Sequence, residues 1–341
     1  MAESIHSPLR AGLRFQRRQV LSLYFCTFDG VGREGVAVSA SPYGPFVNPV
    51  PVEGADGGGI DPAVLVDDDG QAYLYWGQFN LQGAKLNASM TGIVPGTQRT
   101  LLTEAAHGFH EGACIRKVNG HYILVYADVS RGKATCLGHA VADSPLGVYT
   151  KKGIIIDNSG CDKRSWNIHG SICKFREQWY VFYHRSSLSS RFSRRACCEP
   201  ITIQSDGSIT EVEMTTQGAG PPLDATSHIA AYRACTLFGD MTTRFEDGDE
   251  FLTGGTAGDF AGFKTISFMG QTCCTVLVKG KGRVSISLDQ PFHPPVGTIE
   301  VNSEYMWTAT HFSCQELHGT HNLYLIFHSG DISVKEFYFR N

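Results

Sequence analysis

The sequence predicts an all-β fold in which repeated sheets are followed by a separate β-sandwich. Glycine is abundant, with 38 residues among 341, and the apolar spacing typical of helices is scarce. Short alternating apolar and polar runs recur along the chain, and turn residues separate them. The first two-thirds repeat one hairpin pattern about every 50 residues, which is typical of the blades of a β-propeller.

The repeated element is a hairpin made of an apolar strand, a turn and a run of aromatic and aliphatic residues. Three complete copies span residues 63–76, 113–126 and 171–183. A fourth copy is half present at residues 20–25, so we expect the first blade to be incomplete or missing. A second element alternates with the hairpins, because residues 35–46 resemble residues 138–149. It supplies the outer strands of the predicted blades.

One hairpin carries a carboxylate at its entrance. Glu111 precedes the small pair Gly112-Ala113, and Asn119-Gly120 joins the two strands that follow. Asn-Gly predicts a two-residue hairpin, because both residues tolerate positive φ. Few basic residues lie near Glu111, so burial could raise its pKa as a general acid requires. The alternative is an ordinary strand-end glutamate in water.

Asp61 occupies the corresponding place one blade earlier, directly before Pro62. Proline restricts the residue ahead of it, so we expect Asp61 to have an extended backbone. The heads of successive inner strands converge on the axis of a propeller, so Asp61 and Glu111 are expected to face one pocket. Glycoside hydrolysis uses two carboxyl groups in this way. A turn-capping aspartate is the alternative for Asp61, and the three aspartates at 67–69 are interpreted as turn formers.

A turn-rich stretch at residues 217–222 predicts a domain boundary. Residues 1–222 are assigned to the propeller, with a last strand pair at 201–212, and residues 223–341 to a β-sandwich of jelly-roll type. The sandwich strands are expected at residues 263–268, 275–278, 283–288, 297–301, 321–327 and 334–339.

Four motifs in the expected order resemble glycoside hydrolase family 43. They are IDPAVLVDDDGQAYLYWG, HEGACIRKVNGHYILVYA, WNIHGSICKFREQWYVFYHRSS and the later Asp206-Gly207 turn. The resemblance covers residues 20–216 and implies a five-bladed propeller that cleaves arabinofuranosyl or xylosyl linkages with inversion. It implies that Glu111 is the general acid, and that Asp61 tunes the pKa of the acid and orients the substrate.

The resemblance also implies roles for three residues outside these carboxylates. His169 is similar to an axial histidine beside a central metal ion or water, so a structural calcium is expected there if any metal is bound, although no cofactor is required. Arg194 or Arg195 is similar to an active-site arginine that binds substrate. The residues alone leave an alternative open for each. His169 could be a hydrogen-bonded histidine of the core, and Arg194 and Arg195 could lie on a solvated strand face.

The general base of the family, an aspartate near the start of the first blade, has no counterpart upstream of Val20. An inverting enzyme places that base about 6.5–9.5 Å from the acid. A positioned base typically contributes about 10²–10⁴-fold to the rate, so hydrolysis is expected to be slow. Asp29 and Asp56 are the nearest carboxylates in the sequence that could substitute for it.

Residues 223–341 resemble carbohydrate-binding module family 6. The similar segments are residues 247–251, 254–268, 284–289, 297–299, 307 and 319–327. The resemblance implies that aromatic rings stack on sugars, and Trp307 is the candidate for this contact. A core tryptophan is the alternative. The asparagine that usually binds sugar near the C-terminus of this family is not clear in residues 329–337.

Composition excludes some classes of partner. A net charge of −4 gives no reason to expect nucleic acid or an anionic membrane. No apolar segment reaches the roughly 20 residues of a membrane span. The first residues lack the apolar core of a secretory signal, although the resemblance implies a usually secreted protein. The eleven cysteines are interpreted as buried small residues, ahead of disulfides and metal ligands.

Two functions from different classes fit these observations. One is a monomeric hydrolase acting on a plant cell-wall polysaccharide or oligosaccharide. The other is a non-catalytic carbohydrate-binding protein with an incomplete propeller and a working sandwich. A propeller used only for protein contacts does not explain carboxylates at two blade heads. Five-bladed sucrose-type hydrolases are a further alternative, but their Arg-Asp-Pro and Glu-Cys motifs are missing.

Overall fold

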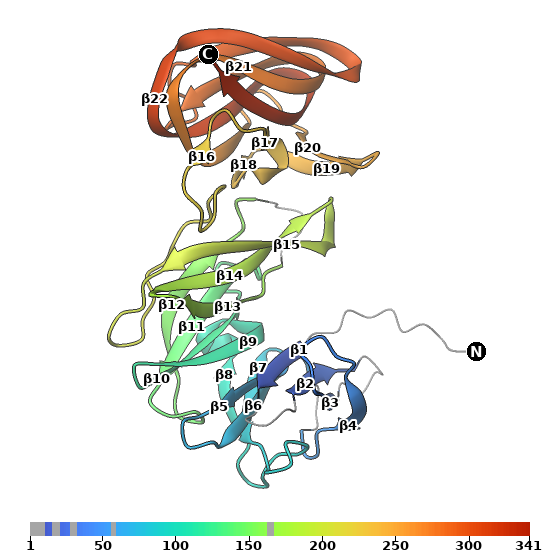
Figure 1. The fold of residues 1–341 in the computed structure, drawn as a ribbon, viewed down its shortest axis with the longest axis vertical. Coiled ribbons are helices and arrows are strands. Elements are labelled where there is room, and N and C mark those ends of the chain that lie inside the picture. Colours follow the sequence, from blue (N-terminus) through green and yellow to red (C-terminus); the bar gives the residue numbers. More distant parts are fainter. Residues whose placement is uncertain (1–10, 16–20, 28–32, 56–58, 162–166) are drawn as a thin grey trace, which may run out of the picture. The chain divides into compact units, whose positions relative to one another are not determined.

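The computed structural model describes residues 11–15, 21–27, 33–55, 59–161 and 167–341 (Figure 1). The two substitute bases considered above, Asp29 and Asp56, lie outside these residues. Almost all of the regular secondary structure in the described residues is β-strand, and the helical elements are α1 (Glu104–His107) and the 3-10 turn η1 (Ala231–Arg233). Neither helix in this part of the chain has the length and apolar character that crossing a membrane requires.

The chain forms two compact units. The first consists of the residues up to Ile156 together with Ile168–Tyr183 and Ile201–Val212. The second consists of Asp157–Asn167, His184–Pro200 and Glu213–Asn341.

Successive antiparallel sheets follow one another along the first part of the chain (Figure 1). The first sheet contains β1 (Ala11–Phe15), β2 (Leu21–Cys26), β3 (Glu34–Ser39) and β4 (Val47–Pro51). The second contains β5 (Ala63–Val66), β6 (Ala72–Trp76), β7 (Asn80–Lys85) and β8 (Arg99–Thr103). The third contains β9 (Phe109–Val118), β10 (His121–Asp128), β11 (Cys136–Ala142) and β12 (Thr150–Asp157). The fourth contains β13 (Gly170–Phe175), β14 (Gln178–Ser187) and β15 (Ser190–Ile201).

The blade pattern is confirmed, and the first sheet is more complete than the sequence predicts. β1 pairs antiparallel with β2, from Ala11 opposite Phe25 to Phe15 opposite Leu21. The half hairpin expected at residues 20–25 is therefore the second strand of a four-stranded sheet. The pattern missed β1 because its sequence AGLRF contains alanine, glycine and arginine, which give a weak strand signal.

The aromatic residues repeated in the hairpins are buried where neighbouring sheets pack against each other. Every residue of β6 is buried. Leu74 and Trp76 share a core with Tyr24 of the first sheet, whereas Tyr73 and Tyr75 share a core with β9 and β10 of the third. Successive side chains of a strand point to opposite faces of the sheet. The two tyrosines therefore lie on one face of β6 and Leu74 and Trp76 on the other, and both faces are covered by a neighbouring sheet.

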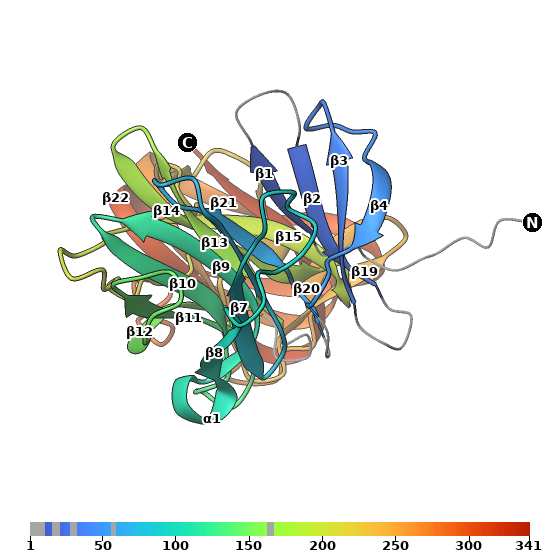
Figure 2. The same cartoon turned by 90° about the horizontal axis from the view of Figure 1, so that it is seen from below.

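Local turns fix where the third sheet begins and reverses. Asn119 and Gly120 have φ values of +52° and +85°, which confirms the predicted two-residue turn. α1 lies beside β8, just before the chain enters β9 (Figure 2). The side chain of Thr103 caps its start, and Gly108 ends it in a left-handed conformation.

The aspartates at 67–69 lie in the turn that the sequence predicts, and Asp67 also joins two sheets. The Gly70 N–H donates to the Asp67 carbonyl over 2.9 Å. The Asp67 carboxylate accepts hydrogen bonds from Lys117 and Tyr122 of the third sheet. Burial acts to raise the pKa of Asp67, but these hydrogen bonds bring it below its usual value. This carboxylate therefore holds the second and third sheets together.

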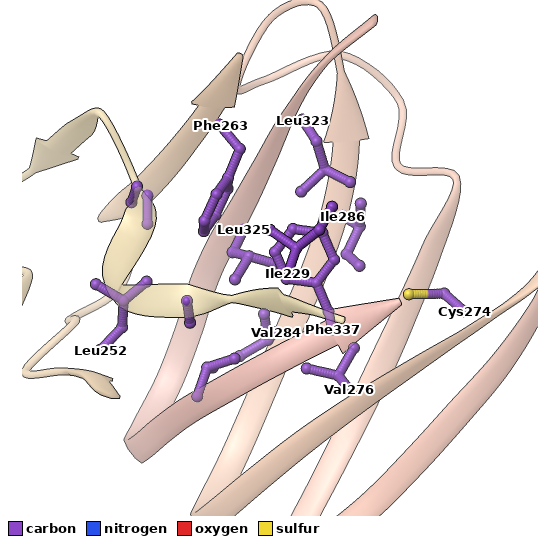
Figure 3. Close-up of a cluster of buried hydrophobic side chains, with 14 of the residues drawn as sticks. Ile229, Leu252, Phe263, Cys274, Val276, Val284, Ile286, Leu323, Leu325 and Phe337 are labelled. Carbon is purple, nitrogen blue, oxygen red and sulfur yellow. The ribbon is translucent and has the colours of Figure 1, made fainter. Parts of the chain in front are cut away.

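The second unit is built largely from two very long, bent strands. Its strands are β16 (Leu223–Asp224), β17 (Ile229–Ala230), β18 (Thr236–Phe238), β19 (Thr242–Glu246), β20 (Asp249–Thr253), β21 (Phe260–Leu288) and β22 (Gly297–Arg340). β21 pairs with two stretches of β22 at once, so Cys274 lies opposite both Phe312 and Phe339. All six predicted sandwich strands lie within β21 or β22. Figure 3 shows the apolar side chains that this β-sandwich encloses.

The turn-rich stretch before β16 is hydrogen-bonded to the second unit. Thr216 Oγ1 accepts from the Lys264 N–H over 2.9 Å, and Gln217 Oε1 accepts from the Thr265 N–H over 2.9 Å. The last division between the units falls after Val212, ten residues ahead of the boundary that the sequence analysis assigns after residue 222.

The end of the β14–β15 hairpin also belongs to the second unit. The Leu188 N–H donates to Glu250 Oε1 over 2.9 Å, and Ser189 Oγ donates to the Thr243 carbonyl over 3.1 Å. These bonds hold the hairpin end against β19 and β20.

All eleven cysteines lie in the described residues, and the structure pairs none of them in a disulfide. Cys26, Cys136, Cys161, Cys235 and Cys274 are buried. The interpretation as buried small residues holds for these five. Cys173 is exposed, so for it the interpretation fails.

Candidate active site

A β-bulge orients Glu111. Cys114 pairs with Val125 and Glu111 pairs with Ala127, so β9 has one more residue than β10 between these pairs. Gly112 lies inside the bulge with φ of +69°, a conformation that glycine adopts at little cost. Bulges of this kind re-aim side chains beside active sites. The Glu111 side chain leaves the strand here and is buried, with 9% of the residue exposed.

Asp61 lies two residues before β5 in a left-handed backbone conformation. Its φ is +58°, so the extended backbone expected from the following proline is wrong. The Gly77 N–H donates to the Ile60 carbonyl over 2.9 Å, and this bond ties the turn to the end of β6. Positive φ costs a non-glycine residue on the order of 1–2 kcal/mol and is concentrated at functional sites. The tertiary contacts of this buried turn therefore override the local preference.

His169 lies just before β13 and meets both carboxylates. Its Nε2 is 2.8 Å from Glu111 Oε1 and 3.9 Å from Asp61 Oδ2. One ligand atom from each of the three side chains lies within 4.8 Å of the others. The structure thus brings Asp61 and Glu111 together, as the sequence predicts, and places His169 beside both.

The close approach of the His169 ring also requires glycine at position 112. A Cβ on Gly112 would lie 2.7 Å from the His169 ring, which is closer than real Cβ contacts. Glycine is therefore required both by the backbone of the bulge and by the approach of the imidazole.

Gln78 is a site residue that the sequence analysis missed. It follows Gly77 in the turn between β6 and β7, and its Nε2 donates to Glu111 Oε2 over 2.7 Å. Both carboxylate oxygens of Glu111 therefore have a partner, Gln78 on one and His169 on the other. The sequence signal was the glycine directly after an apolar strand, which marks a sharp turn at a blade head.

Phe79 presents an aromatic ring on the turn that also carries Gln78. It has φ of +62°, an outlier for a bulky residue, and 47% of it is exposed. Its backbone N–H donates to the carbonyl of His110, the neighbour of Glu111, over 2.8 Å. Its ring packs edge-on against the His110 imidazole at 5.2 Å.

A third carboxyl group, Glu34 at the start of β3, lies next to this cluster. It is 1% exposed, and neither carboxyl oxygen has a hydrogen-bond partner among the residues that the structure describes. A Cβ on Gly59 would lie only 2.4 Å from Glu34 Oε1, so glycine leaves room for this side chain. Burial, followed by the negative charge of Asp61, raises the pKa of Glu34 to about 8. The signal in the sequence was an acidic residue on the face of β3 that also carries Val36.

The cluster of Asp61, Glu111 and His169 fits a calcium ion only in part. Calcium takes six to eight oxygen ligands. The cluster offers two carboxylates and one imidazole nitrogen, and that nitrogen is already hydrogen-bonded to Glu111. This donor set does not make a calcium site by itself.

The two arginines predicted to bind substrate lie in β15, within the second unit. Arg195 Nη2 pairs with Glu250 Oε2 at 2.8 Å, and its guanidinium lies 4.0 Å from the ring centre of Tyr232. Arg194 is exposed. The contacts of Arg195 are with residues of the second unit, and its role in substrate binding stays a prediction.

Trp307, the residue predicted to stack on sugar, lies in β22. It is half-buried, and the Phe251 ring packs edge-on against it at 5.1 Å. The ammonium groups of Lys279 and Lys335 lie 5.2 and 5.9 Å from its ring centre. The ring is therefore already flanked by two cations, and its role in sugar binding stays a prediction.

Two buried carboxyl groups lie at the heads of neighbouring sheets, and one of them is held by an amide and an imidazole; glycoside hydrolases also use a pair of carboxyl groups. Residues 22–209 match the model of glycosyl hydrolases family 43, and the chain belongs to this family. The family is one of glycoside hydrolases.

Curated relatives agree with this assignment. A xylosidase/arabinosidase of Thermoclostridium stercorarium is 30% identical, over 82% of this chain and 69% of the relative. An arabinoxylan arabinofuranohydrolase of Paenibacillus polymyxa is 26% identical, over 96% of this chain and 58% of the relative. The chain thus spans less than two-thirds of the second relative.

Solved structures agree in fold. The GH43_1 enzyme from Xanthomonas citri complexed with xylose is 31% identical, with a TM-score of 0.52 over 60% of this chain and 71% of that chain. A family 43 arabinoxylan arabinofuranohydrolase from Bacillus subtilis in complex with cellotetraose has a TM-score of 0.52 at 22% identity. It covers 97% of this chain and 79% of that chain, which supports the fold of both units.

Proposed function

We propose that this chain hydrolyses arabinofuranosyl or xylosyl linkages of hemicellulose, with Glu111 as the acid that protonates the leaving oxygen. The observation that carries the proposal is the meeting of Glu111, Asp61 and His169 within 4.8 Å. Membership of the family and relatives named as xylosidases and arabinofuranohydrolases support the substrate class. The substrate is a cell-wall polysaccharide or oligosaccharide, and the chain acts on it as a monomer without a cofactor.

Two neighbours orient the acid. The Gln78 amide holds one carboxyl oxygen of Glu111, and His169 holds the other. A carboxyl group fixed at both oxygens loses little freedom when the substrate arrives, which favours proton transfer in the correct direction. When Nε2 of His169 carries the proton, the imidazole also provides a route for reprotonating Glu111 after turnover.

Asp61 orients the sugar and does not serve as the base. Its oxygen lies within 4.8 Å of that of Glu111. This is shorter than the about 6.5–9.5 Å that leaves room for the attacking water in an inverting enzyme. A buried carboxylate this close to the acid interacts with it electrostatically and accepts hydrogen bonds from the sugar hydroxyls. A positioned base typically contributes about 10²–10⁴-fold to the rate, so fast turnover requires a base other than Asp61.

The experiment compares wild type, Glu111→Gln and the control Glu177→Gln on 4-nitrophenyl α-L-arabinofuranoside and 4-nitrophenyl β-D-xyloside. The Glu177 side chain is 96% exposed at the β13–β14 turn, so its substitution removes one surface charge and its 3.2 Å pairing with Lys174. We expect Glu111→Gln to lose about 100-fold or more in kcat/KM, while Glu177→Gln retains the wild-type rate. Equal rates for all three proteins would remove Glu111 from the mechanism.

The second candidate function is carbohydrate binding without turnover. It is favoured by the short Asp61–Glu111 separation, which is less than the spacing of the acid and the base in an inverting enzyme. Titration calorimetry with xylo-oligosaccharides separates the two functions. Binding with no release of sugar, abolished by Trp307→Ala, supports this candidate, whereas sugar release that depends on Glu111 supports the first.

A further inference from the structure

The second unit contains a cavity of about 320 Å³ that is lined by three arginines. The polar and charged lining includes Arg185, Arg195, Glu199, Thr215, Gln217 and Arg233. Pockets for small molecules begin at about 300 Å³. The cavity therefore has room for one sugar-sized molecule and is larger than a single inorganic ion requires.

Arg185 is a buried cation in the lining of this cavity. It lies in β14 and is 4% exposed. Its Nη1 donates to the Ala234 carbonyl over 2.7 Å, and its Nη2 donates to the Cys161 carbonyl over 3.4 Å. Within the described part of the chain no carboxylate pairs with it, and its Nε has no hydrogen-bond partner. Burying a charge in this way is strongly unfavourable unless an anion pairs with it.

The other two arginines are held in place at the same cavity. Arg195 Nη2 pairs with Glu250 Oε2 at 2.8 Å, so Arg195 offers hydrogen-bond donors to the cavity but adds little net charge. Arg233 Nη2 donates to the Thr216 carbonyl over 3.0 Å and has no carboxylate partner among the described residues.

Glu199 is the only acidic residue among the described residues that line the cavity. Its Oε1 accepts from the N–H of Thr215 over 2.8 Å and from the Thr215 hydroxyl over 3.0 Å. Arg185 and Arg233 therefore outweigh Glu199, and the lining carries a net positive charge.

We propose that this cavity binds the carboxylate of a sugar acid of hexuronic type. A planar guanidinium matches a carboxylate in shape and charge, and a bound carboxylate would give Arg185 the partner it lacks. The side-chain amide nitrogen of Gln217 offers a donor for a sugar hydroxyl. This site lies in the second unit, and its occupation does not depend on hydrolysis at Glu111.

The test is titration calorimetry of the full chain with glucuronic acid at low ionic strength, with glucose and inorganic phosphate as separate arms. The variants are Arg185→Gln and Arg233→Gln, and the matched control is Arg244→Gln, whose 60% exposed side chain lies outside the cavity. We expect glucuronic acid to bind and glucose not to bind. Each cavity variant should weaken binding about tenfold or more, and the control should leave it unchanged.

Three results would overturn the assignment. They are an absence of binding to the wild type, equal binding of glucose, and inorganic phosphate binding as tightly as glucuronic acid. Circular dichroism of each variant shows whether it is folded. Arg233 is only partly buried, so Arg233→Gln keeps the proposal testable if Arg185→Gln fails to fold.

Discussion

Replacing Glu34 by glutamine should change how the stability of the protein depends on pH. Glu34 is a buried carboxyl group without a hydrogen-bond partner among the described residues, and it lies close to the charge of Asp61. Glutamine has nearly the same shape as the protonated acid but does not ionise. The variant therefore removes one titration and leaves the packing almost unchanged.

The size of the effect follows from the pKa of Glu34, which rises from 4.5 to about 8. One pKa unit corresponds to about 1.4 kcal/mol, so ionising this group costs on the order of 5 kcal/mol more in the folded protein than in the unfolded chain. Between pH 4.5 and about 8 the folded state keeps a proton that the unfolded chain has lost. The free energy of unfolding therefore falls as pH rises through this window, and the fall ends above pH 8.

The assay is urea unfolding of wild type and Glu34→Gln from pH 4 to pH 9, followed by intrinsic fluorescence. We expect the two proteins to be similarly stable near pH 4 and the variant to gain steadily, reaching a few kcal/mol near pH 8. Glu177→Gln, at an exposed site, should parallel the wild type throughout. If the free energies of unfolding of Glu34→Gln and wild type changed with pH in parallel over the whole range, Glu34 would not be a neutral buried group.

Three further substitutions test the surroundings of the acid. Gly112→Ala should destabilise the protein by about 1–3 kcal/mol and lower kcat at least tenfold, because the new Cβ strains the bulge and displaces His169. Thermal unfolding measures the loss of stability, and steady-state kinetics measure the loss of rate. Gln78→Ala should lower kcat about 10- to 100-fold with little change in KM, because the carboxyl of Glu111 loses its fixed orientation. Phe79→Ala should raise KM for xylo-oligosaccharides about fivefold and leave aryl glycosides unaffected, because only the longer substrate reaches this ring.

Matched controls separate these effects from general damage. Gly132→Ala introduces the same strain at φ of +94° where no atom lies within 4 Å, so it should lose some stability but no activity. Phe79→Trp should retain the KM of wild type. A Gly112→Ala enzyme with normal kcat, or a Phe79→Ala enzyme with normal KM, would contradict the assigned roles.

The sheets and the meeting of Asp61 with Glu111 could be predicted because a repeated pattern carries them. Each blade places an apolar strand after its head, so carboxylates at equivalent positions of two blades must converge. The alternation in β6 could be recognised for the same reason, since each face of that strand packs on a neighbouring sheet. Such features depend on periodicity, which a single sequence shows.

The remaining features depend on contacts between residues far apart in the chain. The left-handed backbone of Asp61 reflects a hydrogen bond from Gly77 to the neighbouring Ile60, and this overrides the preference set by Pro62. Gln78 meets Glu111 across two sheets. The end of the β14–β15 hairpin joins the second unit through Glu250, which no local pattern indicates.

The dependence of the rate on the leaving group tests the role of Glu111 most directly. The measurement is kcat/KM of wild type and Glu111→Gln on a series of aryl β-D-xylosides whose phenols span a wide range of pKa. A poor leaving group needs the proton of the acid, whereas a very good one departs without it. The loss caused by the substitution should therefore be large for the most basic phenols and should nearly vanish for 2,4-dinitrophenol. The same loss for every phenol would contradict Glu111 as the general acid.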